Sequence, residues 1–346
     1  MVVRPLPLEL QHEILRLCLP FPNPKNLAAR RAACRNLSLV HRDWTPIAQR
    51  ELFAWPRLCF VAAGGAAGVR QHLKKHLKRN AGKKCQEIKA RHLARLHRLE
   101  IRVAGDLLKL RKDDRDVFAS LIARAASLTE LVVMAEYWVE GSGKCAFRPA
   151  DFPNLKALHF RHSNPYLLCP WSKDTYRPLA TLPTVKTLTL SEMWKVDLGE
   201  YPNIETLFVS RSSLSSLAGE AMPNLRRLGW CDNLPALCPE LHRVNLHSTL
   251  EHVFVGVYRT VVSDSPCFFQ REVDEFCTVL DALAASSSFK TFTFVTPPDA
   301  DLIPVQAILQ RVDEKAAAGL SFEHRRMKEE DVEEEMWRWA QSLPKE

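Results

Sequence analysis

Three groups of side chains in this sequence could do chemistry, and none has the pattern of a known active site. His72 and His76 stand four residues apart, a spacing that would place both on one face of a helix and allow a shared metal ion. Two lysines lie between them, and no glutamate is present to act as a base. Because the lysines would repel a cation, we expect no metal at this pair.

Cysteine and histidine side chains form the second group, which consists of Cys231, Cys238, His242 and His247. Their spacing, C-x6-C-x3-H-x4-H, differs from that of the usual zinc fingers. The third group, Asp113, Asp114 and Asp116, fits the acidic first turn of a helix. The sequence also contains no glycine-rich phosphate loop, nucleophile elbow or H-E-x-x-H segment. We therefore expect no catalytic residue, metal or cofactor, and no enzyme activity.

Charge is distributed unevenly along the 346 residues, which carry a net +8. Residues 1–112 hold 24 lysines and arginines against 7 acidic residues, whereas residues 321–346 hold 5 against 8. The run from His72 to Arg79 could contact phosphates, but it lacks interleaved aromatic side chains for base stacking. It also fits the solvated face of a helix. Nucleic-acid binding by this basic third therefore stays an alternative to a protein partner.

Composition indicates a folded chain: 46% of the residues are hydrophobic and 25% are charged. No run approaches 18 consecutive apolar residues, and the opening ten residues do not resemble a signal peptide. The ten cysteines include no Cys-x-x-Cys pair, and most have apolar neighbours, as reduced buried thiols do. We expect a protein of the cytoplasm or nucleus with no membrane partner.

Apolar residues at relative positions 1, 4 and 6 recur eight times between residues 96 and 294, at spacings of 19 to 39 residues. The copies are Leu96/Leu99/Ile101, Leu128/Leu131/Val133, Leu155/Leu158/Phe160, Val185/Leu188/Leu190, Ile204/Leu207/Val209, Leu225/Leu228/Trp230, Leu250/Val253/Val255 and Phe289/Phe292/Phe294. Positions 4 and 6 alternate with other residues, which predicts a short strand in each copy with both side chains on one face. Three copies open with Pro-Asn, which suits the turn before a strand.

This pattern resembles that of leucine-rich repeats, with irregular periods. The resemblance implies an α/β solenoid: parallel strands on a concave side, helices and loops on a convex side. Helices are predicted at Val69–Leu77, Asp113–Ala126 and Val273–Leu283, because each aligns apolar residues on one face. The proline-rich stretch Asn164–Pro183 is predicted to be an insertion loop that could carry function.

The first fifty residues combine two apolar motifs in order. Leu-Pro-x-Glu-x-x-x-x-Ile-Leu begins at Leu6, and Leu-x-x-Val-x-Arg-x-Trp ends at Trp44. Together, from Leu6 to Phe53, they resemble an F-box, and F-box proteins often continue into leucine-rich repeats. So short a segment cannot cover all of its apolar side chains by itself, which favours a partner.

The resemblance implies a non-catalytic substrate-recognition subunit of an SCF-type E3 ubiquitin ligase. The F-box would bind a Skp-type adaptor, and through it a cullin-RING ligase. Its adaptor-binding residues would be Leu6, Pro7, Leu8, Leu10, Ile14, Leu15, Leu39, Val40 and Trp44. A nucleic-acid-binding repeat protein and an F-box scaffold without ligase function are the alternatives.

The concave face of the solenoid would bind a protein substrate through side chains between the apolar positions. The candidates are Arg98, Glu100, Arg102, Glu130, Met134, Lys156, His159, Arg161, Lys186, Phe208, Arg226, Arg227, His252 and Phe254. Phe208 and Phe254 are the expected aromatic anchors. A register shift of one residue would exchange the two faces.

Three regions are therefore predicted: an F-box-like helical domain at 1–53, an irregular leucine-rich-repeat solenoid at 54–320, and an acidic C-terminal helix or cap at 321–346. Within the last, Glu329–Leu343 aligns Val332, Met336, Trp339 and Leu343 on one side. Such a helix would either close the core of the last repeat or dock as a peptide-like helix.

Overall fold

The structure is a computed structural model of the chain. It describes residues 7–20, 27–48, 57–61, 97–104, 127–135, 152–162, 183–193, 196–198, 201–212, 214–217, 222–232, 249–258, 266–298, 303–317 and 321–342. The predicted helices at Val69–Leu77 and Asp113–Ala126, and nearly all of the predicted loop Asn164–Pro183, lie outside these residues.

Ten strands form one parallel sheet, in which each strand pairs with the strand of this sheet that follows it in the sequence. They are β1 (Arg57–Val61), β2 (Arg98–Ala104), β3 (Glu130–Ala135), β4 (Ala157–His162), β5 (Thr187–Ser191), β7 (Thr206–Ser210), β9 (Arg227–Asp232), β10 (His252–Val257), β11 (Thr291–Thr296) and β12 (Ser321–Arg326). A second, two-stranded sheet pairs β6 (Val196–Leu198) with β8 (Leu214–Leu217). Sequential parallel pairing is the topology of a solenoid, so the α/β prediction is confirmed at this level.

All eight copies of the apolar pattern fall on the large sheet, one copy to each strand from β2 to β11. Strands β1 and β12 extend it at the two edges and were not predicted. Because residues 321–326 form the last strand, the predicted solenoid boundary at residue 320 is one strand too early.

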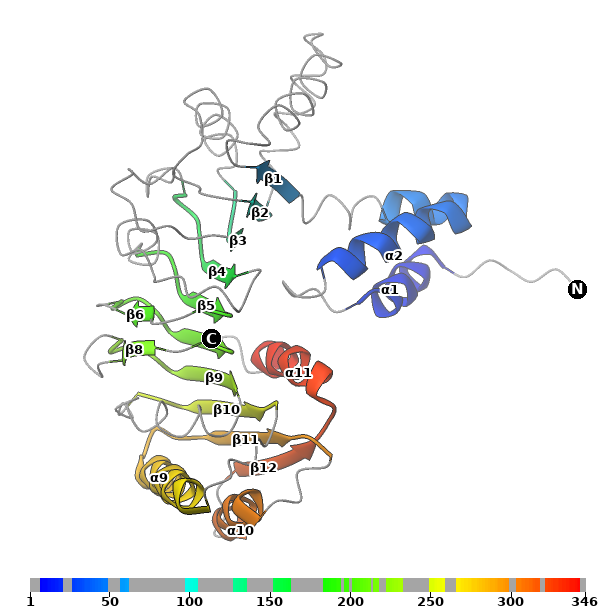
Figure 1. The fold of residues 1–346 in the computed structure, drawn as a ribbon. Helices are drawn as coiled ribbons and strands as arrows, with labels where there is room; N and C mark the ends of the chain where they lie inside the picture. The colour runs from blue at the N-terminus through cyan, green and yellow to red at the C-terminus, as the bar shows by residue number, and fades with distance from the viewer. Residues whose placement is uncertain are drawn as a thin grey trace, which may run out of the picture.

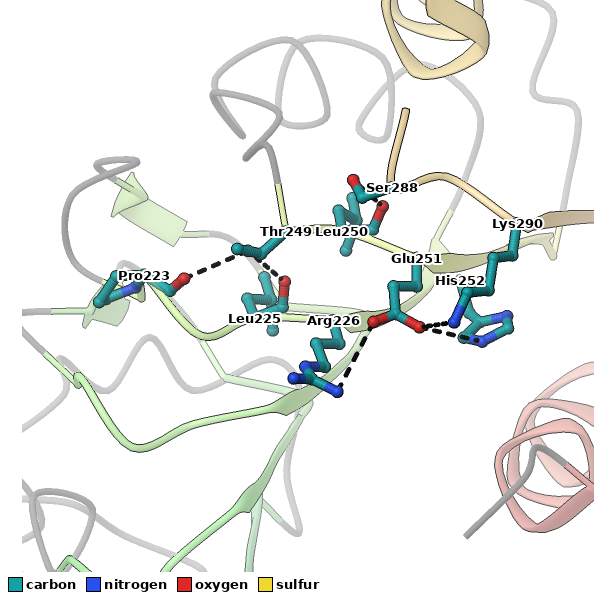
Figure 2. Close-up of polar contacts among 9 residues, drawn as sticks. All are labelled: Pro223, Leu225, Arg226, Thr249, Leu250, Glu251, His252, Ser288 and Lys290. Atoms are coloured by element: carbon teal, nitrogen blue, oxygen red, sulfur yellow. Dashed lines mark hydrogen bonds and ion pairs between the residues drawn. The ribbon is translucent and has the colours of Figure 1, made fainter. Parts of the chain in front are cut away.

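Main-chain hydrogen bonds continue the pairing into the turns that precede the strands of the large sheet from β3 to β11. The amide of Arg226 donates to the carbonyl of Glu205 at 2.9 Å, and the amide of Glu251 donates to the carbonyl of Arg226 at 2.9 Å. The hydroxyl of Thr249 reaches back to the carbonyls of Pro223 and Leu225 (Figure 2). These bonds satisfy backbone groups that the turns would otherwise leave unpaired, so neighbouring repeats stay in register.

The repeat core lies on one face of the sheet. It includes the described residues at positions 1, 4 and 6 of the copies, together with the apolar side of α9 (Pro266–Ala285) and part of α10 (Ile303–Ala317). Phe276 of α9 packs against Phe292 and Phe294 of β11, with ring centroids 6.4 and 5.7 Å apart. The predicted helix at Val273–Leu283 is confirmed, and its apolar side faces the core.

The opposite face of the sheet carries a third helix, α11 (Glu329–Ser342), which Figure 1 shows on the other side of the strands from α9 and α10. It follows β12 after only two residues, Met327 and Lys328. We call this side of the sheet the inner face; its side chains include His159, Phe208 and Phe254. The C-terminal helix was predicted correctly, but it lies across the inner face and does not close the end of the repeat core.

The N-terminal residues form a small helical unit, made of α1 (Leu8–Cys18), α2 (Leu27–Val40) and the short η1 (Arg42–Trp44). Figure 1 shows this unit apart from the strands. Leu19, Cys34 and Ala48 form its small buried core. The guanidinium of Arg30 donates to the carbonyl of Pro20 at 2.6 Å, which connects the end of α1 to α2. Within the described residues, no helix is both long and apolar enough to span a bilayer.

Candidate binding surfaces

Two surfaces are candidates for partner binding: the inner face of the sheet and the exposed side of the helical unit. On the inner face, the strand register aligns side chains in rows that run across the sheet. One row contains Val132, His159, Thr189, Phe208, Gly229 and Phe254. His159, Phe208 and Phe254 are thus on the side of the sheet that the sequence predicted.

Helix α11 covers Phe208 and Phe254, so neither is available as the exposed anchor that the sequence predicted. Trp337 packs on the ring of Phe208 at a centroid distance of 5.1 Å, and Trp339 packs on Phe254 at 5.5 Å. Both phenylalanines are buried. The physical reason is that α11 presents two tryptophans and Met336 to this face, and their burial removes a large apolar area from water.

His159 is also covered, because Trp337 lies over its ring at 5.2 Å. Its Nδ1 lies 2.8 Å from the hydroxyl of Thr189, and its Nε2 lies 3.2 Å from a carboxylate oxygen of Glu130. The latter separation suits an ion pair but lacks hydrogen-bond geometry. His159 therefore connects strands β3, β4 and β5 beneath the helix.

Two glycines hollow the inner face where α11 lies. A Cβ atom on Gly229 would come within 2.9 Å of the sulfur of Met336, and one on Gly256 would overlap Val332. Glycine weakens a strand, and its presence inside one often marks close approach by another element. Gly229 leaves space that the ring of Phe208 and Met336 fill, and Gly256 leaves space that Val332 and the thiol of Cys231 fill.

Polar contacts lie at the margins of the α11 contact. Arg211 adopts a left-handed backbone conformation (φ 47°) directly after β7, and its guanidinium lies 4.4 Å from the ring centroid of Tyr258. The same guanidinium pairs with Glu329 at 3.0 Å. On the other side of the helix, Arg325 of β12 pairs with Glu335. Basic side chains of the sheet thus hold acidic side chains of α11.

Cys231 lies beneath α11, with its sulfur 3.5 Å from that of Met336. Burial raises the pKa of the Cys231 thiol well above its ordinary value, and the negative charge of Glu333 adds to the effect. Tyr258 donates or accepts a hydrogen bond with Ser210 at 2.7 Å, and burial likewise raises the pKa of its phenol. Both groups are neutral at ordinary pH, so this part of the inner face is apolar and chemically unreactive while α11 covers it.

Charged side chains at the start of the inner face are already paired with one another. Arg98 Nε lies 2.9 Å from Glu130, the carboxylate that also faces His159. Burial would raise the pKa of Glu130, but His159 and Arg98 together outweigh burial and hold it below its ordinary value. Arg161 lies 3.6 Å from Glu192.

Three predicted substrate-binding residues stand at position 2 of a repeat copy. They lie just before the strands, along the side of the sheet where the strands begin. There Lys186 pairs with Glu205 at 2.7 Å, and Glu251 lies between Arg226 and Lys290 (Figure 2). The hydrogen bond from Lys290 holds the pKa of Glu251 below its ordinary value, and Lys156 is exposed at the same edge. Lys156, Lys186 and Arg226 therefore belong to a charged border and not to the floor of the inner face.

The remaining predicted substrate residues divide into two sets. Arg227 and His252 face each other in register on β9 and β10, and His252 Nδ1 lies 2.7 Å from the hydroxyl of Thr291. The side chains of Glu100, Arg102 and Met134 lie outside what the structure describes, although their backbones are in β2 and β3.

The second candidate surface is an apolar stripe on α1, with two further exposed apolar side chains on α2. On α1, Leu10, Ile14 and Leu17 are 53%, 43% and 78% exposed, and their spacing of four and three residues puts them on one side. On α2, Leu39 and Val40 are 86% and 65% exposed. Large apolar side chains that are exposed together on a small unit indicate an interaction surface.

The other predicted adaptor-binding residues differ from this stripe in how far they are exposed. Leu15 is buried, so it supports the unit from inside and is not accessible to a partner, contrary to the sequence prediction. Trp44 is half-buried, and its indole N–H donates to Gln11 at 3.2 Å. Pro7 is exposed at the start of α1, whereas Leu6 and the side chain of Leu8 lie outside the described residues.

The metal candidates of the sequence are mostly undescribed. His72, His76, Cys238, His242 and His247 all lie outside the described residues, and so does the basic run that contains the first two. Within the described part of the chain, no three histidine, cysteine or acidic side chains gather in a way that could hold a metal ion.

Comparisons with known proteins add little to this geometry. No family model matches the chain, and no curated protein is significantly similar to it. Among solved structures, a protein of Bacteroides fragilis determined as a structural genomics target is 12% identical. The alignment covers 78% of this chain and 75% of that chain, with a TM-score of 0.38. A similarity this low supports no argument about function.

Proposed function

We propose that the chain is a non-catalytic substrate receptor of an SCF-type E3 ubiquitin ligase, acting in the cytoplasm or nucleus. The helical unit binds a Skp-type adaptor, which connects it to a cullin-RING ligase. The sheet holds a protein substrate at a fixed distance from the adaptor. Such a subunit makes and breaks no bond itself; it brings a substrate close to the ubiquitin-charged enzyme.

The observation that carries this proposal is the exposed apolar stripe of Leu10, Ile14 and Leu17 on α1, together with the exposed Leu39 and Val40 on α2. The helical unit has a buried core of only a few side chains, yet it leaves these five uncovered. Interfaces bury such side chains at their centre and surround them with polar residues. The two F-box motifs in the sequence cover the same helices, which is why an adaptor is the partner proposed.

The test is adaptor binding by the full-length protein carrying Leu10→Asp and Ile14→Asp. Two charges on the stripe would have to be buried unpaired at the interface, so we expect affinity to fall by roughly tenfold or more. Ala307→Asp adds a charge at an exposed position of α10 and is the matched control. Binding of purified Skp-type adaptor by all three proteins with equal affinity would rule out the stripe as the adaptor site.

A further inference from the structure

The inner face beneath α11 has the features of a binding groove as well as those of a packed core. Its floor is hollowed by Gly229 and Gly256, its walls are the rings of Phe208 and Phe254, and Arg211 and Arg325 stand at its margins. This combination suits one kind of ligand: an acidic amphipathic helix that inserts apolar and aromatic side chains. Helix α11 is such a helix, with three acidic residues in its first turn.

The contact with α11 is separate from the repeat core. Val332, Met336, Trp337 and Trp339 belong to their own cluster on the inner face, whereas positions 1, 4 and 6 of the repeats pack on the other side of the sheet. Only Met327 and Lys328 join the helix to β12. The helix can therefore leave its groove without opening the repeat core.

One polar group in the α11 contact is buried without a hydrogen-bond partner among the described residues. The indole N–H of Trp337 is buried and, among the described residues, donates no hydrogen bond. A buried donor without an acceptor weakens the contact that contains it. The two ion pairs at the margins are partly exposed, and pairs of that kind contribute little. These contacts hold α11 in place, but a helix that satisfied the buried donor would bind the same surface more tightly.

We propose that this groove is a docking site for an acidic amphipathic helix, which α11 occupies in the free protein and a substrate helix of the same chemistry takes when α11 lifts. The proposal deepens the receptor role and rests on it, because it names the class of substrate segment. It needs no adaptor, so the two proposals fail separately.

The first experiment measures chemical labelling of the Cys231 thiol in the whole chain, which reports whether α11 leaves the inner face. The thiol is buried under α11 and becomes accessible only when the helix leaves. We expect N-ethylmaleimide to label Cys231 while the amides of Val253 and Val255 in β10 stay protected from hydrogen exchange. Trp337→Ala should speed the labelling by roughly tenfold or more without changing that protection. Labelling that occurs only as fast as the β10 amides exchange would overturn the proposal.

The second experiment uses a fluorescent peptide of residues 328–342 as the probe helix. We expect it to bind full-length Trp337→Ala saturably and to protect Cys231 from labelling. A peptide with alanine at Met336, Trp337 and Trp339 is the control and should not bind. The Skp-type adaptor should bind Trp337→Ala as it binds the original protein.

Two outcomes of the peptide experiment would overturn the proposal. The first is no binding of the peptide to a protein whose Cys231 is labelled readily. The second is a Trp337→Ala protein that elutes as a dimer with Cys231 protected, since the occupant of the groove would then be α11 of a second copy.

Discussion

Leu17 and Leu39 on the helical unit and Phe208 and Phe254 on the sheet are all apolar side chains outside the repeat core. The leucines are largely exposed, whereas the phenylalanines are sealed by a helix from the far end of the chain. The same kind of residue therefore has opposite surroundings in the two regions. The difference shows that an apolar surface predicts a partner only after the rest of its own chain has been placed.

The largest difference between the inner face and the helical unit is expected when one apolar side chain is removed from each and the free energy of unfolding is measured. Phe254→Ala leaves a cavity between β10 and Trp339, and we expect it to lower the free energy of unfolding by about 3–5 kcal/mol. Leu39→Ala removes a side chain that is 86% exposed, so the change should stay within about 0.5 kcal/mol. Urea unfolding of both variants measures the difference. Similar losses for the two would mean that the helical unit is covered by this chain after all.

A smaller effect is expected from filling the groove. In Gly256→Ala the new methyl group overlaps Val332 of α11, so we expect a loss of about 1–3 kcal/mol in unfolding free energy. Val332→Ala makes room for that methyl group, and the double variant should lose less than the sum of the two single changes. The double-mutant cycle is measured by urea unfolding. Additive losses would show that α11 does not approach Gly256 closely.

Sequence predicted the repeat core better than it predicted the surfaces. Positions 4 and 6 of each copy follow the two-residue period of a strand, so local pattern alone was enough to predict the eight strands of one sheet. Strand β12 escaped prediction because Ser321–Arg326 holds a single large apolar residue, Phe322, and is otherwise polar.

The predicted binding residues depended on long-range packing, which no local pattern contains. Phe208 and Phe254 were placed on the correct face, but they contact a helix about 80 or more residues later in the chain. A signal for that contact was present in Gly229 and Gly256, which interrupt strands at inward-facing positions. Leu15 was misplaced for a similar reason, since both sides of α1 are apolar and only the fold decides which one is covered.

The smallest expected effect is a pH dependence of stability at the polar end of the inner face, where Glu130 lies, in contrast to the apolar part beneath α11. The pKa of the Glu130 carboxyl lies below its ordinary value of 4.5: burial raises it, but the neighbouring side chains of His159 and Arg98 outweigh burial and lower it. A carboxyl with a lowered pKa in the folded state adds stability above the unfolded value and loses it as the pH falls through the folded value.

We therefore expect the free energy of unfolding to fall more steeply for the original protein than for Glu130→Gln as the pH drops below about 4.5, measured by urea unfolding at each pH. Glu314→Gln is the control, because Arg311 also lowers the pKa of that carboxyl but the pair lies on the solvent side of α10. It should change the slope less, since solvent screens an exposed pair. Equal slopes for the original protein and Glu130→Gln would show that the Arg98–Glu130–His159 contacts do not stabilise the folded inner face.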